Sequence, residues 1–171
     1  MRETNPFSVF CPPKAKYLIL GSFVAKDGRK GVSYDWYYSN GRNQFWRILE
    51  NIYGVELKSK ETQQALFTKL AVAIADIILQ CERVGRSSLD THLTNFVYNS
   101  SAIKKVLRKN HIEKIFFTSR FVETHYRRHF KNLIEKFPDI ELITLPSPSP
   151  RYAAMSKAGK IKKYAQVFPK L

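Results

Sequence analysis

Tyr17-Leu-Ile-Leu-Gly-Ser-Phe23 is the stretch that decides the fold. Its apolar residues follow one another without a polar neighbour up to Gly21 and Ser22. A strand with one face in water would alternate apolar and polar residues, so this segment predicts a strand buried on both faces. Strands of this kind belong to parallel sheets, and the glycine and serine mark the point where this one ends.

The rest of the chain alternates helical patterns with further apolar runs. We expect helices over 44–53, 61–70, 100–109, 121–137 and 155–168, and strands over 71–79, 115–118 and 140–145. The run 71–79 is apolar enough to be one central strand, and Ser100 or Ser101 is expected to cap the third helix. Strands alternating with helices predict an α/β fold of the three-layer αβα kind, with a four-stranded parallel sheet in a single domain over residues 1–171.

The composition favours a folded protein with an anionic partner. The 29 Lys and Arg residues outnumber the 14 Asp and Glu residues, which gives a net charge of +15. This excess favours binding to a polyanion, although a basic protein without such a partner is the open alternative. A hydrophobic content of 44% argues against disorder. No run reaches the ~18 apolar residues of a membrane span and no secretory signal is visible, so we expect no membrane partner and a cytoplasmic location.

Unusual residues end three of the four predicted strands. Gly21-Ser22-Phe23 leads into a long loop, Asp76 interrupts the run 71–79, and Leu145-Pro-Ser-Pro-Ser-Pro-Arg151 follows the last strand. The carboxyl ends of parallel strands meet at one edge of a sheet, where ligands bind. The sequence therefore predicts one site at that edge, to which all three segments contribute.

Four segments, taken in order, resemble a known family. They are Gly21-Ser-Phe23, Tyr37-Tyr-Ser-Asn-Gly-Arg-Asn-Gln-Phe-Trp46, Arg86-Ser-Ser-Leu-Asp90 and Leu145-Pro-Ser-Pro-Ser-Pro150. Over residues 17–168 the chain is similar to the uracil-DNA glycosylase superfamily, and it resembles the hypoxanthine-DNA (deoxyinosine) glycosylase branch most closely.

The chain also departs from the pattern of that branch. Asn40-Gly41 stands where the branch has His-Pro, Val24 replaces a proline, and the inserted-looking stretch 25–33 lengthens the first loop. Ser22 and Phe23 follow the first strand, where the wider superfamily carries a catalytic Asp or Asn. The resemblance instead implies that an asparagine of the second segment does the catalytic work.

The resemblance implies a fold and an activity. The expected strand order is 2-1-3-4, and the expected enzyme is a monofunctional DNA glycosylase of base-excision repair. It would hydrolyse the N-glycosidic bond of a deaminated base, uracil or hypoxanthine, flipped out of DNA, and leave an abasic site. Water would be the nucleophile, and neither a metal ion nor a cofactor is implied. The expected partner is DNA that contains a deaminated base, bound by a monomeric protein.

Asn43 and Asp76 are the catalytic candidates. Asn43 would orient the water or polarise the base, or it would simply cap the helix that begins beside it. Asp76 would order the same water or hold Asn43, because a carboxylate in an apolar run needs a partner or a raised pKa. Capping a nearby loop or pairing with Arg83 is the plainer alternative for Asp76. His125 and His129 have a zinc-binding spacing but no third ligand, so no metal site is predicted.

The substrate-binding candidates flank the first loop. The backbone amides of Ser22 and Phe23 would bind a carbonyl of the base. Tyr38 would close the pocket or form a hydrogen bond with the base, or it would simply pack beside the helix. Phe45 would stack on the flipped base. Packing in the core is the alternative for Phe45, and Trp46 is expected there.

The proline-rich loop supplies the DNA-binding candidates. The hydroxyls of Ser147 and Ser149 would contact phosphates, and Pro150, Arg151 or Tyr152 would fill the gap that the flipped nucleotide leaves. Prolines stiffen this loop, so ordering it on DNA costs little entropy. An ordinary turn before the last helix is the alternative.

Two other functions stay open at this point. A nucleic-acid-binding protein of the same fold without catalysis would bind duplexes and release no base. A hydrolase of small nucleosides or nucleotides on a doubly wound sheet would need neither the proline-rich loop nor so large a positive charge.

Overall fold

The structure is a computed structural model that describes residues 1–24, 35–87 and 89–171. In these residues the chain forms a four-stranded parallel sheet and a three-stranded antiparallel sheet. The stretch 25–33 that lengthens the first loop, and Ser88 of the third resembling segment, lie outside the described residues.

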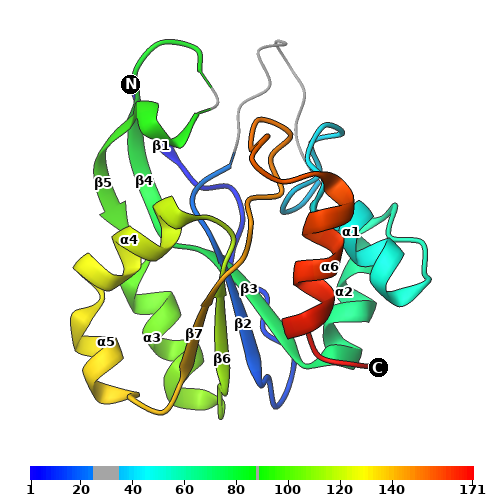
Figure 1. Cartoon of the computed structure of the whole chain (residues 1–171). Coiled ribbons are helices and arrows are strands. Elements are labelled where there is room, and N and C mark those ends of the chain that lie inside the picture. Colours follow the sequence, from blue (N-terminus) through cyan, green and yellow to red (C-terminus); the bar gives the residue numbers. More distant parts are fainter. Residues whose placement is uncertain (25–34, 88) are drawn as a thin grey trace.

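The parallel sheet forms the centre of the molecule (Figure 1). Its strands, in spatial order, are β3 (Val72–Asp76), β2 (Tyr17–Gly21), β6 (Lys114–Phe117) and β7 (Glu141–Thr144). β2 pairs with β3 on one side and with β6 on the other, and all neighbouring pairs are parallel. The register Gly21↔Asp76 places the ends of β2 and β3 side by side.

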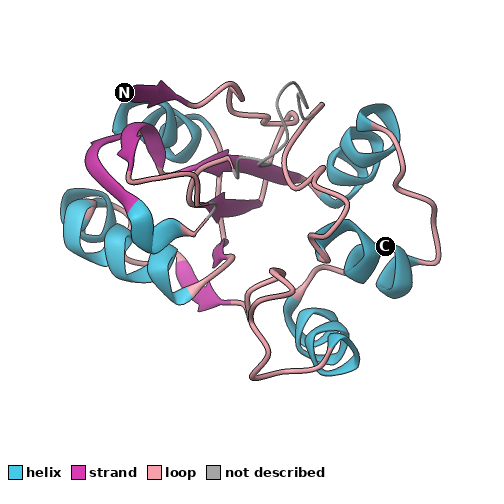
Figure 2. Cartoon of the chain, turned by 90° about the horizontal axis from the view of Figure 1, so that it is seen from above, coloured by secondary structure: helices cyan, strands magenta, loops and turns pink. Residues whose placement is uncertain are grey.

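Helices cover both faces of this sheet (Figures 1 and 2). One face carries α1 (Phe45–Tyr53), α2 (Lys60–Leu70) and α6 (Lys157–Val167), and the other carries α3 (Ser100–Lys109), α4 (Arg120–His129) and α5 (Lys131–Lys136). The side chain of Ile19 packs against the helices on the first of these faces, while those of Leu18 and Leu20 pack against the helices on the second. Because both sides of β2 are buried, the strand needs an apolar residue at every position. The expected α/β architecture is confirmed in this form. No helix in the described parts of the chain combines the length and the apolar character that crossing a membrane requires.

The apolar run 71–79 is not one strand, which corrects the expectation. β3 ends at Asp76, and β4 (Ile78–Arg83) lies in the antiparallel sheet. The amides of Ile77 and Ile78 donate to the carbonyls of Gly21 and Ser22, so the chain stays against the end of β2 while it changes sheet. Ile77 and Ile78 are fully buried, and the apolar run therefore gives no sign of the break.

The antiparallel sheet has the order β1-β4-β5 and was not among the predicted elements. β1 (Arg2–Thr4) is only three residues long, and β5 (Leu93–Tyr98) carries polar residues between its apolar ones. A short 3-10 turn, η1 (Asp90–His92), precedes β5. This turn brings Asp90, the last residue of the third resembling segment, close to the end of β2.

Two helix predictions also need correction. The predicted helix 121–137 is divided into α4 and α5 at Phe130, whose φ of −119° and ψ of 29° are not helical. Phe130 is buried, so the apolar stripe continues through the break and the periodicity does not reveal it. Helix α3 begins after Asn99 without a side-chain cap, so neither Ser100 nor Ser101 caps it.

Ile74→Ala and Leu79→Ala test the division of the apolar run. Ile74 is fully buried in β3, so its truncation is expected to lower the free energy of unfolding by about 2–5 kcal/mol. Leu79 is 38% exposed on β4, so its truncation should change that energy by less than about 0.5 kcal/mol. Urea denaturation measures both values, and equal losses would contradict the two-strand arrangement.

Candidate functional site

A cleft lies at the carboxyl end of the parallel sheet. Its volume of about 950 Å³ is in the range of pockets that hold small ligands. The chain lines it with the end of β2, the loop of residues 35–44 before α1 (the asparagine loop), the segment before η1, and residues 146–151 (the serine–proline loop). The lining residues include Ser22, Phe23, Tyr38, Asn43, Arg86, Asp90, Thr118, Ser147, Ser149, Pro150 and Arg151. All of the candidates from the sequence line the cleft except Asp76 and Phe45.

A single junction joins the asparagine loop to the serine–proline loop. The amide of Gln44 donates a 2.9 Å hydrogen bond to the carbonyl of Pro148. The ammonium of Lys160 on α6 donates to Gln44 Oε1 at 2.9 Å and to the carbonyl of Ser149 at 3.0 Å. The two loops are therefore adjoining walls of the cleft, above the helix α6 in Figure 1.

Asn43 stands in the cleft lining at the start of α1. Its Oδ1 accepts a 2.9 Å hydrogen bond from the amide of Phe45, the first residue of the helix. The N-cap position itself belongs to Gln44, whose side chain makes no capping bond. Among the described residues, none accepts a hydrogen bond from Asn43 Nδ2 and none joins Asn43 to Asp76. The amide nitrogen of Asn43 is thus the group available to a ligand.

Tyr38 covers Phe45. The two rings stack with centroids 4.4 Å apart, and Phe45 is fully buried beneath Tyr38. The Tyr38 hydroxyl donates to Thr118 Oγ1 at 3.0 Å. The backbone of Tyr38 has a φ of 57°, a left-handed conformation that strains a bulky residue and occurs where the surroundings enforce it. Of this stacked pair it is therefore Tyr38 that lines the cleft, while Phe45 and the buried Trp46 belong to the core.

Asp76 lies behind the floor of the cleft. Its carboxylate accepts a 2.8 Å hydrogen bond from Asn5 Nδ2, and burial raises its pKa to about 7, although the Asn5 bond lowers it. A side chain on Gly21 would collide with the Asp76 carboxylate and the Tyr38 hydroxyl, so these groups pack directly against the end of β2. The absence of a side chain at Gly21 is what allows this close approach.

Asp90, the last residue of the third resembling segment, brings a carboxylate into the cleft. The Ser22 hydroxyl donates to Asp90 Oδ1 at 2.9 Å. Burial raises the pKa of Asp90, while the Ser22 bond and the charge of Arg83 lower it. Among the described residues, no acceptor meets the backbone amides of Ser22 and Phe23. The end of β2 thus offers two amide donors beside a partly buried carboxyl.

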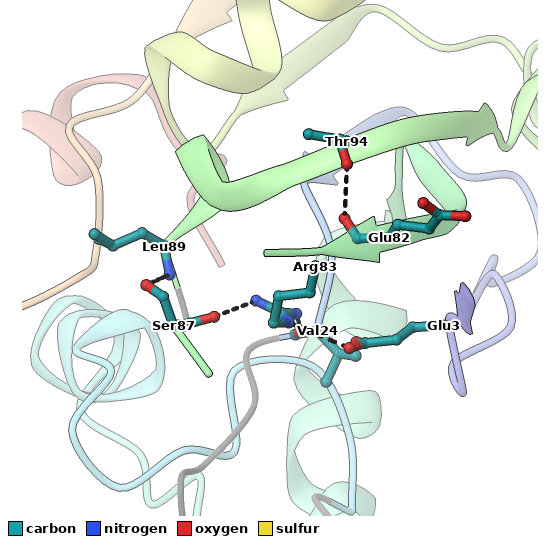
Figure 3. Close-up of polar contacts among 7 residues, drawn as sticks. All are labelled: Glu3, Val24, Glu82, Arg83, Ser87, Leu89 and Thr94. Carbon is teal, nitrogen blue, oxygen red and sulfur yellow. Dashed lines mark hydrogen bonds and ion pairs between the residues drawn. The ribbon is translucent and has the colours of Figure 1, made fainter. Parts of the chain in front are cut away.

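Arg83 braces this wall of the cleft and does not pair with Asp76, so the predicted Asp76–Arg83 pair is wrong (Figure 3). Its side chain is 3% exposed and forms an ion pair with Glu3 at 3.4 Å. It also donates to the carbonyls of Ser87 at 2.8 Å and Val24 at 3.2 Å. One guanidinium therefore fixes both chain segments that flank Ser22 and Asp90.

The serine–proline loop is held by its own hydroxyl oxygens. Ser147 Oγ accepts from the amide of Ser149, and Ser149 Oγ accepts from the amide of Arg151. Each hydroxyl uses its oxygen as the acceptor, which leaves its proton to donate to a ligand. Pro150 and Arg151 are exposed at the rim, and Tyr152 is exposed beside them.

Sequence reasoning missed Lys160 and Asn5. Lys160 lies one helical turn before Tyr164 on the inward face of α6, so the period of the helix already placed a lysine among buried residues. Asn5 reaches Asp76 across a long separation in the sequence, and no local pattern announces such a contact.

The two histidines of α4 belong to an aromatic cluster. The Tyr98 hydroxyl and His125 Nδ1 share a 2.7 Å hydrogen bond, and His129 stacks on Tyr98 at 4.5 Å. Within the ranges that the structure describes, no three His, Cys, Asp or Glu side chains gather as a metal ion would require.

The fold has a counterpart among solved structures, although no protein-family profile and no curated protein matches the chain. That counterpart is a solution NMR structure from Methanosarcina acetivorans, described as a "putative Uracil DNA glycosylase". The TM-score is 0.68 at 22% sequence identity, over 98% of this chain and 97% of that chain. At this identity the similarity shows a shared fold over nearly the whole of both chains.

Asp76→Asn is expected to stabilise the protein more at about pH 8 than at about pH 4. The pKa of Asp76 is about 7 in the folded protein against an ordinary 3.8, so the unfolded chain loses this proton first. The carboxyl therefore costs stability progressively as the pH rises from about 4 to 7, and asparagine carries no such cost while still accepting from Asn5. Urea midpoints of both proteins across this range measure the difference, which should grow with pH; a constant difference would contradict the buried-acid assignment.

Proposed function

We propose that the chain is a monofunctional DNA glycosylase that hydrolyses the N-glycosidic bond of a deaminated base, uracil or hypoxanthine, and leaves an abasic site. The observation that carries the proposal is the junction of Gln44, Pro148 and Lys160, because it makes the asparagine and serine–proline loops walls of one cleft. The shared fold and the net charge of +15 support a nucleic-acid substrate.

The extruded base would stack on Tyr38, with Phe45 supporting that ring from behind. A base gains roughly 1–3 kcal/mol from stacking on an aromatic ring. Phe45, the platform favoured by the sequence, could receive a base only after Tyr38 moved aside. The amides of Ser22 and Phe23 would donate to a carbonyl of the base, and such donors stabilise the negative charge that develops as it departs.

Asn43 would hold the attacking water through its side-chain amide. An amide cannot deprotonate water at neutral pH, so its contribution is orientation while the bond to the base breaks. Asp76 lies one layer deeper and would act through the packing of Tyr38 and Gly21 against it. A carboxylate there would favour the positive charge that develops on the sugar.

The serine–proline loop would bind the DNA backbone. The hydroxyls of Ser147 and Ser149 would donate hydrogen bonds to phosphate oxygens, which only accept them. Pro150 and Arg151 at the rim, with Tyr152 beside them, would fill the space that the flipped nucleotide vacates.

A catalytically inactive nucleic-acid-binding protein of the same fold is the second candidate. Two observations favour it: Ser22 and Phe23 carry no acid at the end of β2, and Asp76 does not line the cleft. Such a protein would keep the phosphate contacts and release no base.

Base release from labelled duplexes tests the proposal. Duplexes that carry uracil, hypoxanthine, xanthine or an undamaged base are incubated with the protein and then heated in alkali, which breaks the strand at an abasic site. We expect breaks at uracil or hypoxanthine and none in the undamaged duplex. Binding without a break at any lesion would favour the second candidate.

Asn43→Ser is expected to lower the rate of base release about a hundredfold or more, while duplex affinity stays within about twofold. Serine can still accept from the Phe45 amide, so the start of α1 is preserved. Asn51→Ala, an exposed asparagine of the same helix, is the matched control and should be neutral. Single-turnover rates compare the three proteins, and an unchanged rate in Asn43→Ser would remove Asn43 from the chemistry.

A further inference from the structure

Lys160 is a buried cation that has no carboxylate partner among the described residues. The residue is 1% exposed, and its ammonium donates to the neutral oxygens of Gln44 and Ser149. The ring of Tyr152 lies 5.5 Å from the ammonium. In the described part of the chain, no Asp or Glu oxygen comes within the 4.0 Å of an ion pair with it. Within that part of the chain, its positive charge is therefore not neutralised.

A charge in this position is unfavourable in the free protein. Lysine is rarely buried without a counter-ion, because the ammonium loses its water and gains nothing equivalent. Burial lowers the pKa of Lys160, as expected of an ammonium in that situation. A neutral donor could satisfy the oxygens of Gln44 and Ser149 without the cost of burying a charge. The two neutral hydrogen bonds therefore do not account for a lysine here, whereas an anion arriving beside it would.

The position of Lys160 matches the place where the anion is expected. Its ammonium lies directly behind Ser149, and the residues on the cleft side of that loop include Ser147 and Arg151. Dissolved ions screen a buried charge less than an exposed one, so its attraction for a phosphate persists when that of exposed lysines weakens.

We propose that Lys160 is the positioning residue of a phosphate subsite. Its ammonium holds the serine–proline loop against the asparagine loop, and its counter-ion is a backbone phosphate of DNA bound at Ser147 and Ser149. The inference rests on the proposed function, because it takes a DNA strand as the ligand. It deepens that function by naming the charge that fixes the strand beside the extruded nucleotide.

Lys160→Met tests this assignment, with Lys163→Met as the matched control. Both variants remove one positive charge from α6, but Lys163 is exposed. The probe is a duplex with a stable abasic-site analogue, which binds without reacting. Lys160→Met should bind about tenfold more weakly or worse at both about 0.05 M and about 0.3 M salt, and its urea transition should stay cooperative, which shows that the variant folds. Lys163→Met should lose less than about threefold, and only at the lower salt.

The pKa of Lys160 supplies a readout that a purely structural brace would not move. Carbon-13 labelling of the lysine side chains, with the Lys160 signal assigned by its loss in Lys160→Met, follows the titration by NMR. Adding the duplex should raise this pKa, because a nearby phosphate favours the charged form.

Two results would overturn the inference: equal affinities of Lys160→Met and Lys163→Met, or a Lys160 pKa that the duplex leaves unchanged. Base release by the wild type, measured in parallel, separates the two proposals. If the wild type releases the base and either result is found, this inference fails alone. If the wild type neither binds the duplex nor releases a base, the proposed function fails with it.

Discussion

The hydrogen bond from the Gln44 amide to the Pro148 carbonyl is the contact on which the cleft depends. It joins two loops that are far apart in the sequence and follow different strands. Proline supports the contact because its fixed φ limits the conformations of the loop, so the carbonyl is presented with little loss of entropy. The ammonium of Lys160 then binds an oxygen on each side of the contact. Without this joint, Asn43 and the serine hydroxyls would belong to separate, independently mobile loops.

The end of β2 imposes a second constraint, which is a lack of space. The Asp76 carboxylate and the Tyr38 hydroxyl pack against Gly21. The backbone of Tyr38 is left-handed at this position. The floor of the cleft is therefore rigid. The charge of Asp76 would have two opposite effects on the proposed reaction. An ionised carboxylate would favour a cationic sugar, but it would oppose an anionic departing base. A pKa near 7 would weaken both effects, so in the proposed reaction the amides of Ser22 and Phe23 would be the groups that stabilise the departing base.

The sequence predicts the parts of this structure that depend on local patterns. The unbroken apolar run of β2, the helical periods and the polar strand ends suffice for the α/β fold and for most of the cleft lining. It fails where burial continues through a change of direction, as at Ile77 and Phe130, because hydrophobicity reports burial and not chain path. It also fails for Asn5, whose partner is set by the pairing of distant strands.

The distribution of charge across the cleft favours a polymer over a small molecule as its ligand. Arg42, Arg86 and Arg151 are exposed in the lining, whereas the inner groups are the partly buried Asp90, the neutral phenol of Tyr38 and backbone amides. A free nucleoside has no phosphate that could pair with the arginines at the rim. The phosphates of a free nucleotide lie on one side of its base, so they could reach only part of the rim. A DNA strand carries phosphates on both sides of a neutral base, so it can satisfy the rim and the interior together. The exposed arginines would then speed the association of DNA with the protein, because exposed charges steer the encounter of two partners. The buried groups of the interior would select which base is accepted.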